Sequence, residues 1–517
     1  MMTRLLPVGI QDYPMLREAN CLYVDKTQYF YRLITEGFYY FLSRPRRFGK
    51  SLTISTLEAI FQGKKELFTG TWIESSDYDW KVYPVIRIDM SQLVDKDPAI
   101  FTRNLIECLK KMALSHQLKL AADYAPAAAL SELIEKLGER GKIVVLIDEY
   151  DKPILDRITD PKLRIQFRDI LKDFYTILKA LGGHIRFLIL TGVTKFSKVS
   201  VFSGLNNLTD LTMDSNYAGM VGYTQEELES NFKPWIEALA QKLAKSIPET
   251  LEQIKYWYNG YRFSDSLVSV YNPFSTLKLF ETQKFLTHWF ETGTPSFLIN
   301  LLATKDFDIT ALEGMEVSSE SFSSYDVDKL DARALLYQTG YLTVKSYDPE
   351  FGAYQLGYPN YEVARSFEGK LLEFFSKTDR GTQDDIVWRL AKQLRAQDFE
   401  GFFETLKTFF AGIPYDLHGK GEKYYHLIIY LTLNLAGLAL QAEVHTHRGR
   451  LDAVIVLKDF TAIFEFKLNQ SADIALKQIA DKGYADPYHR EGKPVIAIGV
   501  NFDTTERNVT EWKLQTQ

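Results

Sequence analysis

The sequence predicts an α/β protein that begins with a parallel sheet flanked by helices and ends with a second, smaller α/β region. Short apolar runs at 38–42, 83–91, 143–147 and 184–197 have the composition of buried strands. Stretches with helical periodicity separate these runs, for example TRNLIECLKKMALSHQLKL after the second one. Strands that alternate with helices form parallel sheets, because each connection must cross back over a face of the sheet. A cluster of short strands between 441 and 467 indicates the second region.

Length and composition set the outer bounds. The 517 residues are enough for about two to four domains with substantial cores. Apolar residues make up 46% of the chain and charged residues 25%, as in an ordinary globular protein. The net charge of -6 provides no global basic field, so any contact with nucleic acid has to come from a local patch. The chain has two cysteines, and its sequence shows no secretory signal and no apolar run long enough to span a bilayer. These features predict a cytoplasmic protein without a membrane partner.

The first candidate site is the loop that follows the first strand. Its sequence is RPRRFGKSLT, residues 44–53, and a helix with regularly spaced apolar residues follows it. GKS closes the pattern G-x-x-x-x-G-K-[ST], in which backbone N–H groups and a helix N-terminus bind phosphates. Arg44 stands where that pattern has its first glycine, which affects backbone freedom at one corner but removes no phosphate-binding group. A chance GKS in a basic loop is the alternative.

The individual residues of this loop have expected roles in binding a nucleotide. Lys50 would reach the β- and γ-phosphates, and the hydroxyl of Ser51 would bind Mg²⁺. The loop residues that we expect to contact the nucleotide are Arg46, Arg47, Phe48, Gly49, Lys50, Ser51 and Leu52.

The second signal is a pair of acids that follows a strand buried on both faces. The stretch GKIVVLIDEYDKP places Asp148 and Glu149 at the C-terminal end of its apolar run. Ligands of open α/β sheets bind at the carboxyl ends of the strands, so these acids should lie near the phosphate loop. Asp148 suits Mg²⁺, directly or through water, and Glu149 suits polarising an attacking water. A solvated acidic turn is the alternative.

A third strand ends in the polar residues Thr191, Thr194 and Lys195. In many P-loop ATPases a strand beside the acidic one carries a polar residue that senses the γ-phosphate. Thr194 or Lys195 could have this role, and a plain turn at the end of the strand is the alternative.

Long stretches of the chain resemble the bacterial AAA-ATPase-like family. They read LPVGIQDYPMLREANCLYVDKTQYFYRLI, RPRRFGKSL, VVLIDEYDKPI, TGVTKFSKVSVFSGLNNLTDLT, WYNGYRF and VYNPFSTL, and they cover most of the first 280 residues. In that family an arginine-rich loop without the first glycine is usual. The resemblance implies ATP binding, with Lys50, Ser51, Asp148 and Glu149 at the matching positions, but it does not establish hydrolysis. The loop arginines could bind phosphate or stabilise transition-state charge, or they could pair with nearby acids on the surface.

The middle of the chain is predicted to be largely helical. From 225 to 322 it is rich in aromatic residues, which we expect to form the core of a helical lid. Residues 331–367 then have the order helix, strand, turn, strand, helix, which resembles a winged-helix module, with Val344 and Leu356 flanking the turn YDPEFG. No cluster of Lys and Arg marks its helix, so a structural hinge is favoured over DNA recognition. The segment 379–410 is expected to be a polar helical link.

The C-terminal strands at 450–457 and 461–467 predict a hairpin with a two-residue turn at Lys458-Asp459 or Asp459-Phe460. With the first of these turns, Asp452 lies opposite Glu465 and Arg450 lies opposite Lys467, about 5 Å apart at Cβ. Period-two alternation also places Glu465 and Lys467 on one face. Opposed acids repel unless a cation lies between them, and two carboxylates suit Mg²⁺. A lysine beside the cation could position a nucleophilic water or stabilise developing phosphate charge.

This hairpin resembles the PD-(D/E)XK nuclease family. Asp452, Glu465 and Lys467 match its three core positions, while Leu451 stands where the family name has proline. The resemblance also implies a helix acid, matched by Glu422, in the metal site, and a helix glutamine, matched by Gln478. A salt-bridged, solvated hairpin is the alternative. The histidines do not have the spacing of a zinc site.

The sequence therefore predicts a four-part chain: a P-loop AAA-ATPase-like domain at 1–225, a helical lid at 226–325, a winged-helix-like module with a helical linker at 326–400, and a restriction-endonuclease-like α/β domain at 401–517. The expected function is ATP binding and hydrolysis coupled to a Mg²⁺-dependent nuclease that acts on nucleic acid, with DNA favoured, in DNA processing or defence. One alternative is a regulatory ATP-binding switch whose nuclease-like domain only binds nucleic acid or a protein partner. Another keeps the nuclease and drops the ATPase. A homo-oligomer is compatible with the sequence, which does not give the oligomeric state.

Overall fold

The computed structural model describes residues 4–196, 205–289, 296–304, 307–322, 331–413, 422–437, 440–446, 449–489 and 492–516. Its internal contacts divide the chain into two compact units. The first unit comprises Met1–Leu301 and Glu313–Val363, and the second comprises Leu302–Leu312 and Ala364–Gln517. The finer four-part division stays a prediction.

A parallel sheet of five strands organises the first unit. Its strands are β1 (Tyr39–Ser43), β2 (Val85–Asp89), β3 (Ile143–Asp148), β4 (Ile185–Gly192) and β5 (Thr209–Asp210). The strand order is β2-β3-β4-β1-β5, and every neighbouring pair is parallel. All six residues of β3 are buried, as its continuous apolar run requires. The predicted parallel α/β sheet is therefore confirmed.

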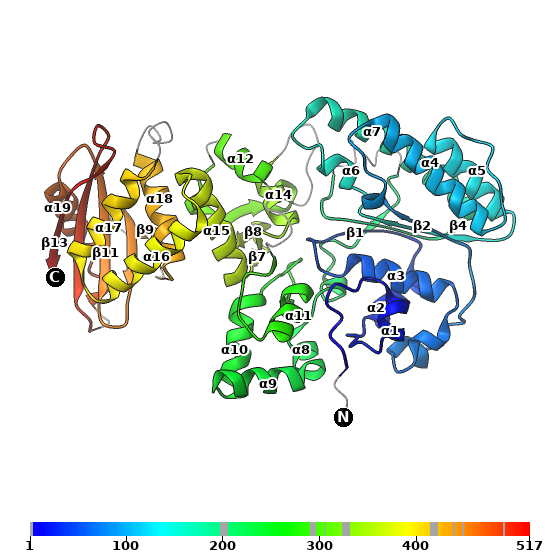
Figure 1. The fold of residues 1–517 in the computed structure, drawn as a ribbon, viewed down its shortest axis with the longest axis horizontal. Coiled ribbons are helices and arrows are strands. Elements are labelled where there is room, and N and C mark those ends of the chain that lie inside the picture. Colours follow the sequence, from blue (N-terminus) through cyan, green and yellow to red (C-terminus); the bar gives the residue numbers. More distant parts are fainter. Residues whose placement is uncertain are drawn as a thin grey trace. The chain divides into compact units, whose positions relative to one another are not determined.

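Helices cover both faces of this sheet (Figure 1). On one face lie α4 (Pro98–Ser115), α5 (Pro126–Gly138) and α7 (Pro161–Ala180), and on the other lie α1 (Tyr13–Glu18), α2 (Thr27–Glu36) and α3 (Lys50–Phe61). The short helix α6 (Lys152–Leu155) follows β3. Asp97 and Asp160 cap α4 and α7 with their side chains, and a proline follows each cap at the first helical position. This combination fixes where a helix begins.

Four further helices follow the sheet. They are α8 (Gln225–Asn231), α9 (Lys233–Leu243), α10 (Ile247–Tyr258) and α11 (Pro273–Thr282). Aromatic residues of these helices and of the segments between them, namely Phe232, Tyr258, Tyr271 and Phe280, are buried in one apolar cluster with Leu22 and Val24 of the N-terminal segment. The aromatic stripe is therefore core, as expected from the sequence.

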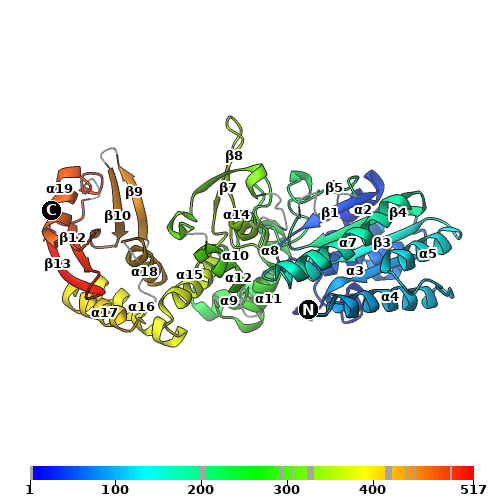
Figure 2. The ribbon, with the colours of Figure 1, turned by 90° about the horizontal axis from the view of Figure 1, so that it is seen from above.

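The winged-helix-like order is present. It consists of α14 (Ala332–Gln338), β7 (Thr343–Asp348), β8 (Ala353–Gly357) and α15 (Tyr361–Ser376). Strands β7 and β8 pair antiparallel with Val344 opposite Leu356, and Figure 2 shows their hairpin extending from the surrounding helices. The preceding stretch adds α12 (Ser296–Thr304), α13 (Ser319–Phe322) and the strand β6 (Met315–Ser318). The sequence did not predict β6, because this short edge strand pairs with β8, which lies much later in the chain.

A mixed sheet of five strands organises the second unit. Its elements are α16 (Arg380–Arg395), α17 (Phe399–Ala411), α18 (Glu422–Leu435), β9 (Leu440–Thr446), β10 (Gly449–Val456), β11 (Thr461–Leu468), α19 (Ala472–Lys482), β12 (Val495–Asp503) and β13 (Asn508–Thr516). The strand order is β13-β12-β11-β10-β9, with only β11 and β12 parallel among these pairs. This is an α/β arrangement of the predicted class.

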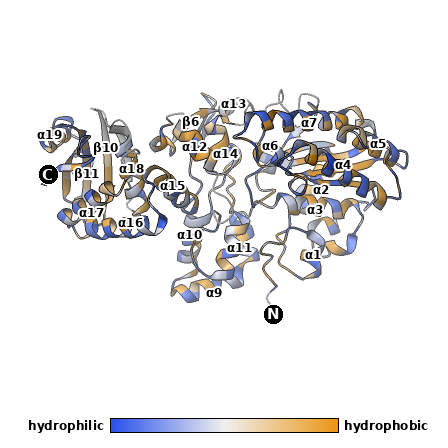
Figure 3. Cartoon of the chain, turned by 45° about the horizontal axis from the view of Figure 1, so that its top comes forward, coloured by the Kyte–Doolittle hydropathy of each residue, from blue (hydrophilic) through white to orange (hydrophobic). Residues whose placement is uncertain are grey.

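The segment 379–410, expected as a polar link, includes a core helix. Aromatic pairs join α17 to the sheet: Phe402 with Phe464, Phe403 with Trp512, and Phe410 with Phe502. The phenylalanines of α17 recur at helical spacing, which puts them on the side that packs against the strands. Figure 3 shows the apolar residues along the strands and on one side of the helices. Within the described residues, no helix combines the length and the apolar character needed to cross a bilayer.

Candidate nucleotide and nuclease sites

The phosphate loop connects β1 to α3 and turns twice through left-handed backbone conformations. Arg47 has a φ of 68° and Gly49 a φ of 89°. Gly49 precedes the first residue of α3, and no side chain caps this helix start in the described structure. The N–H groups of the first turn of a helix have no partner within the helix, so they can bind an anion.

Lys50 is held inside this loop. Its side chain is buried, and its Nζ donates to the carbonyl oxygens of Arg44 and Pro45, both at 2.9 Å. Burial lowers the pKa of Lys50, and the nearby carboxylates of Asp148 and Glu149 act in the opposite direction. The structure therefore brings the loop lysine and the two acids into one electrostatic neighbourhood, as the strand order predicted.

Arg44, at the position of the missing first glycine, is a buried structural residue. Its side chain is 1% exposed, and its Nη1 donates to the carbonyl oxygens of Ser43 at 2.9 Å and of Thr212 at 2.7 Å. The guanidinium lies 4.2 Å from the centre of the Phe263 ring. Burial lowers the pKa of Arg44 to about 10. Arg44 thus ties the start of the loop to two other segments of the first unit.

The other loop residues have different surroundings. Arg46 is exposed, and its charge contributes to lowering the pKa of Lys50. The Arg47 guanidinium lies 3.6 Å from the centre of the Phe274 ring. Phe48 is buried edge-on against Tyr261 and Phe263, and Ser51 and Leu52 are half-buried at the start of α3. Of the three arginines, Arg46 is the one whose side chain is exposed.

The two acids at the end of β3 lie at the carboxyl end of the sheet: Asp148 is the last residue of the strand and Glu149 follows it. Asp148 is buried, and its Oδ1 accepts hydrogen bonds from Thr191 Oγ1 at 2.5 Å and from the N–H of Glu149 at 3.0 Å. Glu149 has a left-handed backbone with a φ of 51°. Burial raises the pKa of Glu149, and the charge of Lys50 opposes this shift. A carboxylate with a raised pKa near a lysine suits a general base.

Thr194, expected to sense the γ-phosphate, is hydrogen-bonded to Asp151. Both its N–H and its Oγ1 donate to Asp151 Oδ2 at 2.6 Å, and burial raises the pKa of this carboxyl. Lys195 forms an ion pair with Asp210 at 2.5 Å, and its N–H donates to Gln338 Oε1 at 2.8 Å. A contact of Thr194 with phosphate stays a prediction. The sequence analysis missed Asp151, although it stands three residues after Asp148 in the same acidic motif.

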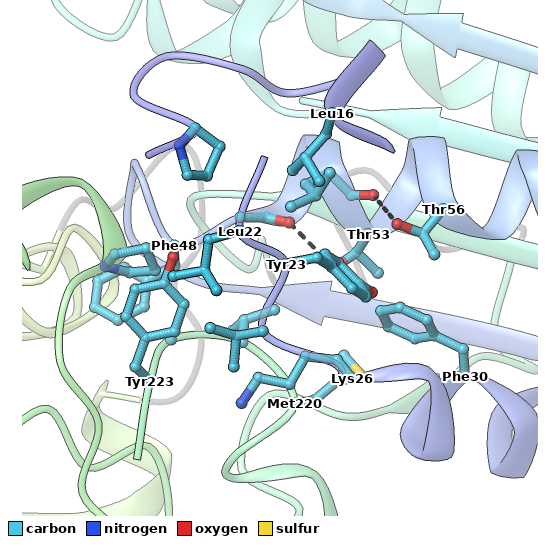
Figure 4. A pocket seen from close by; sticks show the side chains of 17 residues that line it. Leu16, Leu22, Tyr23, Lys26, Phe30, Phe48, Thr53, Thr56, Met220 and Tyr223 are labelled. Atoms are coloured by element: carbon cyan, nitrogen blue, oxygen red, sulfur yellow. Dashed lines mark hydrogen bonds between the residues drawn. The ribbon is translucent and has the colours of Figure 1, made fainter. Parts of the chain in front are cut away.

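A largely apolar pocket opens beside the phosphate loop (Figure 4). Three segments line it: the N-terminal segment, the first turns of α3, and the stretch before α8 with the start of α11. Representative lining residues are Leu22, Tyr23, Phe48, Thr53, Met220 and Tyr223. Its volume of about 70 Å³ is smaller than that of a typical ligand pocket, so a planar group attached to a phosphate chain in the loop would contact its apolar walls. The apolar N-terminal stretch LPVGI and CLYV was the available signal for this pocket.

Lys26, one of the lining residues of this pocket, forms a partly buried ion pair. Lys26 Nζ lies 2.6 Å from Glu227 Oε1 and also donates to the carbonyl oxygen of Gly219 at 2.7 Å. Glu227 in turn completes the capping box of α8 with Thr224. The N-terminal segment is thereby joined to the helices that follow the sheet.

The C-terminal hairpin has the predicted register. Ala453 pairs with Phe464, and Val454 pairs with Ile463. The N–H of Leu457 donates to the carbonyl oxygen of Phe460 at 2.9 Å, which closes the Lys458-Asp459 turn. The side chain of Arg450, expected opposite Lys467, lies outside the described residues.

Asp452, Glu465 and Lys467 meet as expected, with a buried carboxylate at the centre. Glu465 is 1% exposed, and its Oε1 accepts from Lys467 Nζ at 2.8 Å. Asp452 Oδ2 accepts from the N–H of Phe466 at 2.8 Å. Burial, followed by the charge of Asp452, raises the pKa of Glu465 to about 7. Glu465 Oε2 is buried and has no hydrogen-bond partner among the described residues.

These residues fit a divalent cation. A buried carboxylate oxygen without a partner is costly, and a cation would satisfy it and reduce the repulsion from Asp452. Because the donors are carboxylate oxygens, a hard ion such as Mg²⁺ is the best match. The described residues hold no group of three or more potential metal ligands, and the Glu422 side chain, a predicted further ligand, lies outside them. The fit therefore rests on Asp452 and Glu465.

Two further side chains lie around this site. Gln478 of α19 hydrogen-bonds to Tyr484, whose phenol is also influenced by the charges of Glu465 and Asp452. Burial raises the pKa of Tyr484. His426 Nε2 of α18 lies 4.0 Å from Asp452 Oδ2. Gln478 is thus on the predicted helix, whereas the sequence analysis missed Tyr484 and gave His426 no role at this site.

The fold and these two sites define a chain with a phosphate-loop ATPase-type unit and a nuclease-type unit. The profile of the family described as "Predicted AAA-ATPase" matches residues 7–202, and that of the "PD-(D/E)XK nuclease superfamily" matches residues 420–512. The chain is also 38% identical, over 525 residues and 98% of each chain, to the "Uncharacterized protein in vnfD 5'region" of Azotobacter chroococcum mcd 1. The chain belongs to the AAA-ATPase-like proteins with a C-terminal PD-(D/E)XK nuclease-like domain.

Proposed function

We propose that the protein is a cytoplasmic ATPase that carries a Mg²⁺-dependent nuclease and acts on nucleic acid, with DNA as the favoured substrate, in DNA processing or defence. The observation that carries the nuclease proposal is the buried, unpartnered oxygen of Glu465 beside Asp452 and Lys467. A salt-bridged solvated hairpin would leave these carboxylates in water. A buried carboxylate with an unpartnered oxygen, beside the half-buried Asp452, is better explained by a cation site.

At the ATP site, the loop residues would divide the tasks of binding and hydrolysis. Lys50 and the exposed Arg46 would bind the phosphates, while Ser51 and Asp148 would hold Mg²⁺. Bound Mg²⁺ would neutralise phosphate charge. Glu149, with its raised pKa, would polarise the attacking water, and the apolar walls of the pocket beside α3 would contact the base.

At the nuclease site, Asp452 and Glu465 would hold Mg²⁺, with Glu422 as a further ligand. The cation would polarise the scissile phosphate and supply a nucleophilic water. Lys467, which already contacts Glu465, would stabilise developing negative charge on the phosphate. Gln478 and its hydrogen-bond partner Tyr484 would position the side chains around the cation site of Asp452 and Glu465.

A cleavage panel tests the nuclease. Full-length protein is incubated with single- and double-stranded DNA and RNA, with Mg²⁺ or Mn²⁺, and with or without ATP. We expect cleavage by the wild type that Asp452→Ala and Lys467→Ala abolish, whereas Lys458→Ala in the hairpin turn retains it. If no substrate is cut under any of these conditions, the nuclease proposal fails and the regulatory switch takes its place.

The dependence on ATP separates the remaining alternatives. Coupling predicts that Lys50→Ala lowers ATP affinity and removes the effect of ATP on cleavage. If Lys50→Ala leaves both ATP affinity and cleavage unchanged, the chain is a nuclease without a working ATPase.

A further inference from the structure

A second cavity lies in the first unit, at the amino end of its sheet. Arg186, one of its lining residues, is the second residue of β4, whose other end borders the phosphate loop. Phe61, also in the lining, is the last residue of α3, and Lys50 is the first. The cavity has a volume of about 270 Å³, enough for a small molecule. Because it lies at the opposite end of α3 from Lys50, it is separate from the proposed ATP site.

The lining combines aromatic rings with charges of both signs. Tyr31, Phe61, Tyr78 and Tyr83 contribute rings from α2, α3 and the stretch before β2. Charged lining groups are Arg186, Asp77 and Asp79. Both aspartates are exposed, whereas Arg186 and Tyr78 are largely covered.

Two buried polar atoms of this lining have no hydrogen-bond partner in the described part of the chain. They are Nη1 of Arg186 and the hydroxyl oxygen of Tyr78. The other terminal nitrogen of Arg186 donates to the carbonyl oxygen of Ile34 at 2.7 Å, so the guanidinium is fixed in place. Buried donors without partners are costly, and both residues line the same cavity. A ligand with a hydrogen-bond-accepting group would satisfy them together.

The charges narrow the class of ligand. One guanidinium and two carboxylates give the lining a net charge of -1, which disfavours a doubly charged phosphate. Tyr31 O–H donates to Asp77 Oδ1, and the N–H of Lys81 donates to Asp79 Oδ1, so both aspartates are oriented by the protein. The Lys81 ammonium lies 5.4 Å from the centre of the Tyr83 ring, outside the lining. Carboxylates at the rim and tyrosine rings beside them favour an ammonium group.

We propose that this cavity binds a free α-amino acid with an apolar or aromatic side chain. Its carboxylate accepts from Arg186 Nη1 and the Tyr78 hydroxyl, and its ammonium group contacts Asp77 and Asp79. The side chain packs among the rings of Phe61 and Tyr83. Binding requires neither of the activities proposed above.

The test is a thermal-shift screen of the full chain with the twenty L-amino acids at roughly millimolar concentration, followed by calorimetric titration of each hit. We expect at least one apolar or aromatic amino acid to raise Tm. Its N-acetyl and carboxamide derivatives, which lack one of the two charges, should bind at least about tenfold more weakly. This comparison needs only the wild-type protein.

Variants then localise the binding. Tyr78→Phe removes only the unpartnered hydroxyl. Asp77→Asn removes the negative charge but keeps an oxygen that accepts the hydrogen bond from Tyr31. Each should weaken the amino acid at least about tenfold, whereas Tyr124→Phe, at an exposed tyrosine outside the lining, should not. The proposal is overturned if no amino acid raises Tm, if both derivatives bind as well as the free amino acid, or if Tyr78→Phe and Asp77→Asn bind like the wild type. Preferential binding of AMP at this cavity would also overturn it.

Discussion

The phosphate loop and the C-terminal hairpin both bury charged side chains, but the two regions differ in how far hydrogen bonds compensate those charges. Around the loop, the protein supplies carbonyl oxygens for Lys50 and the hydroxyl of Thr194 for Asp151. Arg44 is only partly satisfied: its Nη1 has carbonyl partners, whereas its Nε and Nη2 are buried without a hydrogen-bond partner among the described residues. In the hairpin, Glu465 has a raised pKa and one buried oxygen without a partner. Lys50 and Asp151 are therefore held by hydrogen bonds within the protein, whereas Glu465 has a buried oxygen that the cation proposed above would satisfy.

The largest effect should come from removing the hairpin's buried charge. Glu465→Gln keeps the shape of the side chain but replaces a ligand oxygen by an amide, so nuclease activity should fall by roughly 10²- to 10³-fold. Because no buried carboxylate then remains uncompensated at this position, the free energy of unfolding at pH 8 without divalent cations should not fall. Cleavage rates and urea unfolding with EDTA measure the two effects.

The matched control for this variant is Glu506→Gln, at an exposed glutamate of the same unit. It should change neither cleavage nor stability. A Glu465→Gln protein that is clearly less stable than the wild type with EDTA would contradict the idea that this carboxylate is strained without a cation.

The next largest effect concerns the ammonium group of the loop. On the proposed function, Lys50→Ala removes charge-assisted hydrogen bonds to phosphate, each worth about 1.5–3 kcal/mol, so ATP affinity should fall by roughly 10- to 100-fold. Titration with a fluorescent ATP analogue measures this. Lys110→Ala on the surface of α4 is the control and should bind ATP like the wild type. Equal ATP affinity of the Lys50→Ala protein and the wild type would exclude this loop as the phosphate site.

The raised pKa of Glu465 should also make the stability of the second unit depend on pH. The pKa of Glu465 is raised to about 7, against roughly 4.3 in an unfolded chain. Between these values the folded state holds a proton that the unfolded chain has lost, so stability should fall as pH rises through this window. The decrease should be smaller in Glu465→Gln and with saturating Mg²⁺, which favours the ionised carboxylate. Urea unfolding at several pH values from about 4.5 to about 8 checks whether the free energy of unfolding falls as pH rises.

A smaller loss of stability is expected in the hydrogen-bonded network beside the loop. Thr194→Val removes the hydroxyl that donates to Asp151 and keeps the side chain's shape, so the buried carboxylate loses one of its donors. The free energy of unfolding of the first unit should fall by about 1–3 kcal/mol. Thr176→Val, at an exposed threonine of α7, is the control for the loss of a hydroxyl. Stability equal to that of the control would mean that Thr194 does not support Asp151.

Local sequence signals predicted the parts of both sites that depend on spacing. The turn at Lys458-Asp459 and period-two alternation were enough to place Asp452 near Glu465, because a hairpin's register follows from its turn. The apolar run before Asp148 likewise placed that acid at the carboxyl end of the sheet. Contacts between distant segments could not be obtained this way.

The burial of Arg44 against Phe263 is one such contact, and the strand β6 and the side chain of Tyr484 at the nuclease site are others. Each depends on how separate segments pack in three dimensions. A basic loop residue such as Arg44 is exposed in most proteins, so its sequence neighbours gave no reason to expect burial.

The smallest expected effect concerns the contact between the loop and the end of α14. Gly340 has a φ of 88°, and a Cβ at this position would lie 2.7 Å from the Cβ of Pro45 in the phosphate loop. Gly340→Ala should therefore displace Pro45, whose carbonyl oxygen accepts from Lys50, and weaken ATP binding severalfold, by about 1 kcal/mol.

Gly352→Ala is the control that distinguishes the contact of Gly340 with Pro45 from the backbone strain of an alanine at positive φ. Gly352 also has a positive φ, 62°, but a Cβ there would meet nothing within 4 Å. Both alanine variants should lose stability because alanine disfavours this conformation, by about 1 kcal/mol. Only Gly340→Ala should lose ATP affinity. If the two variants bind ATP equally well, the end of α14 does not support the phosphate loop, and the order of the loop then depends on its own hydrogen bonds and on Arg44.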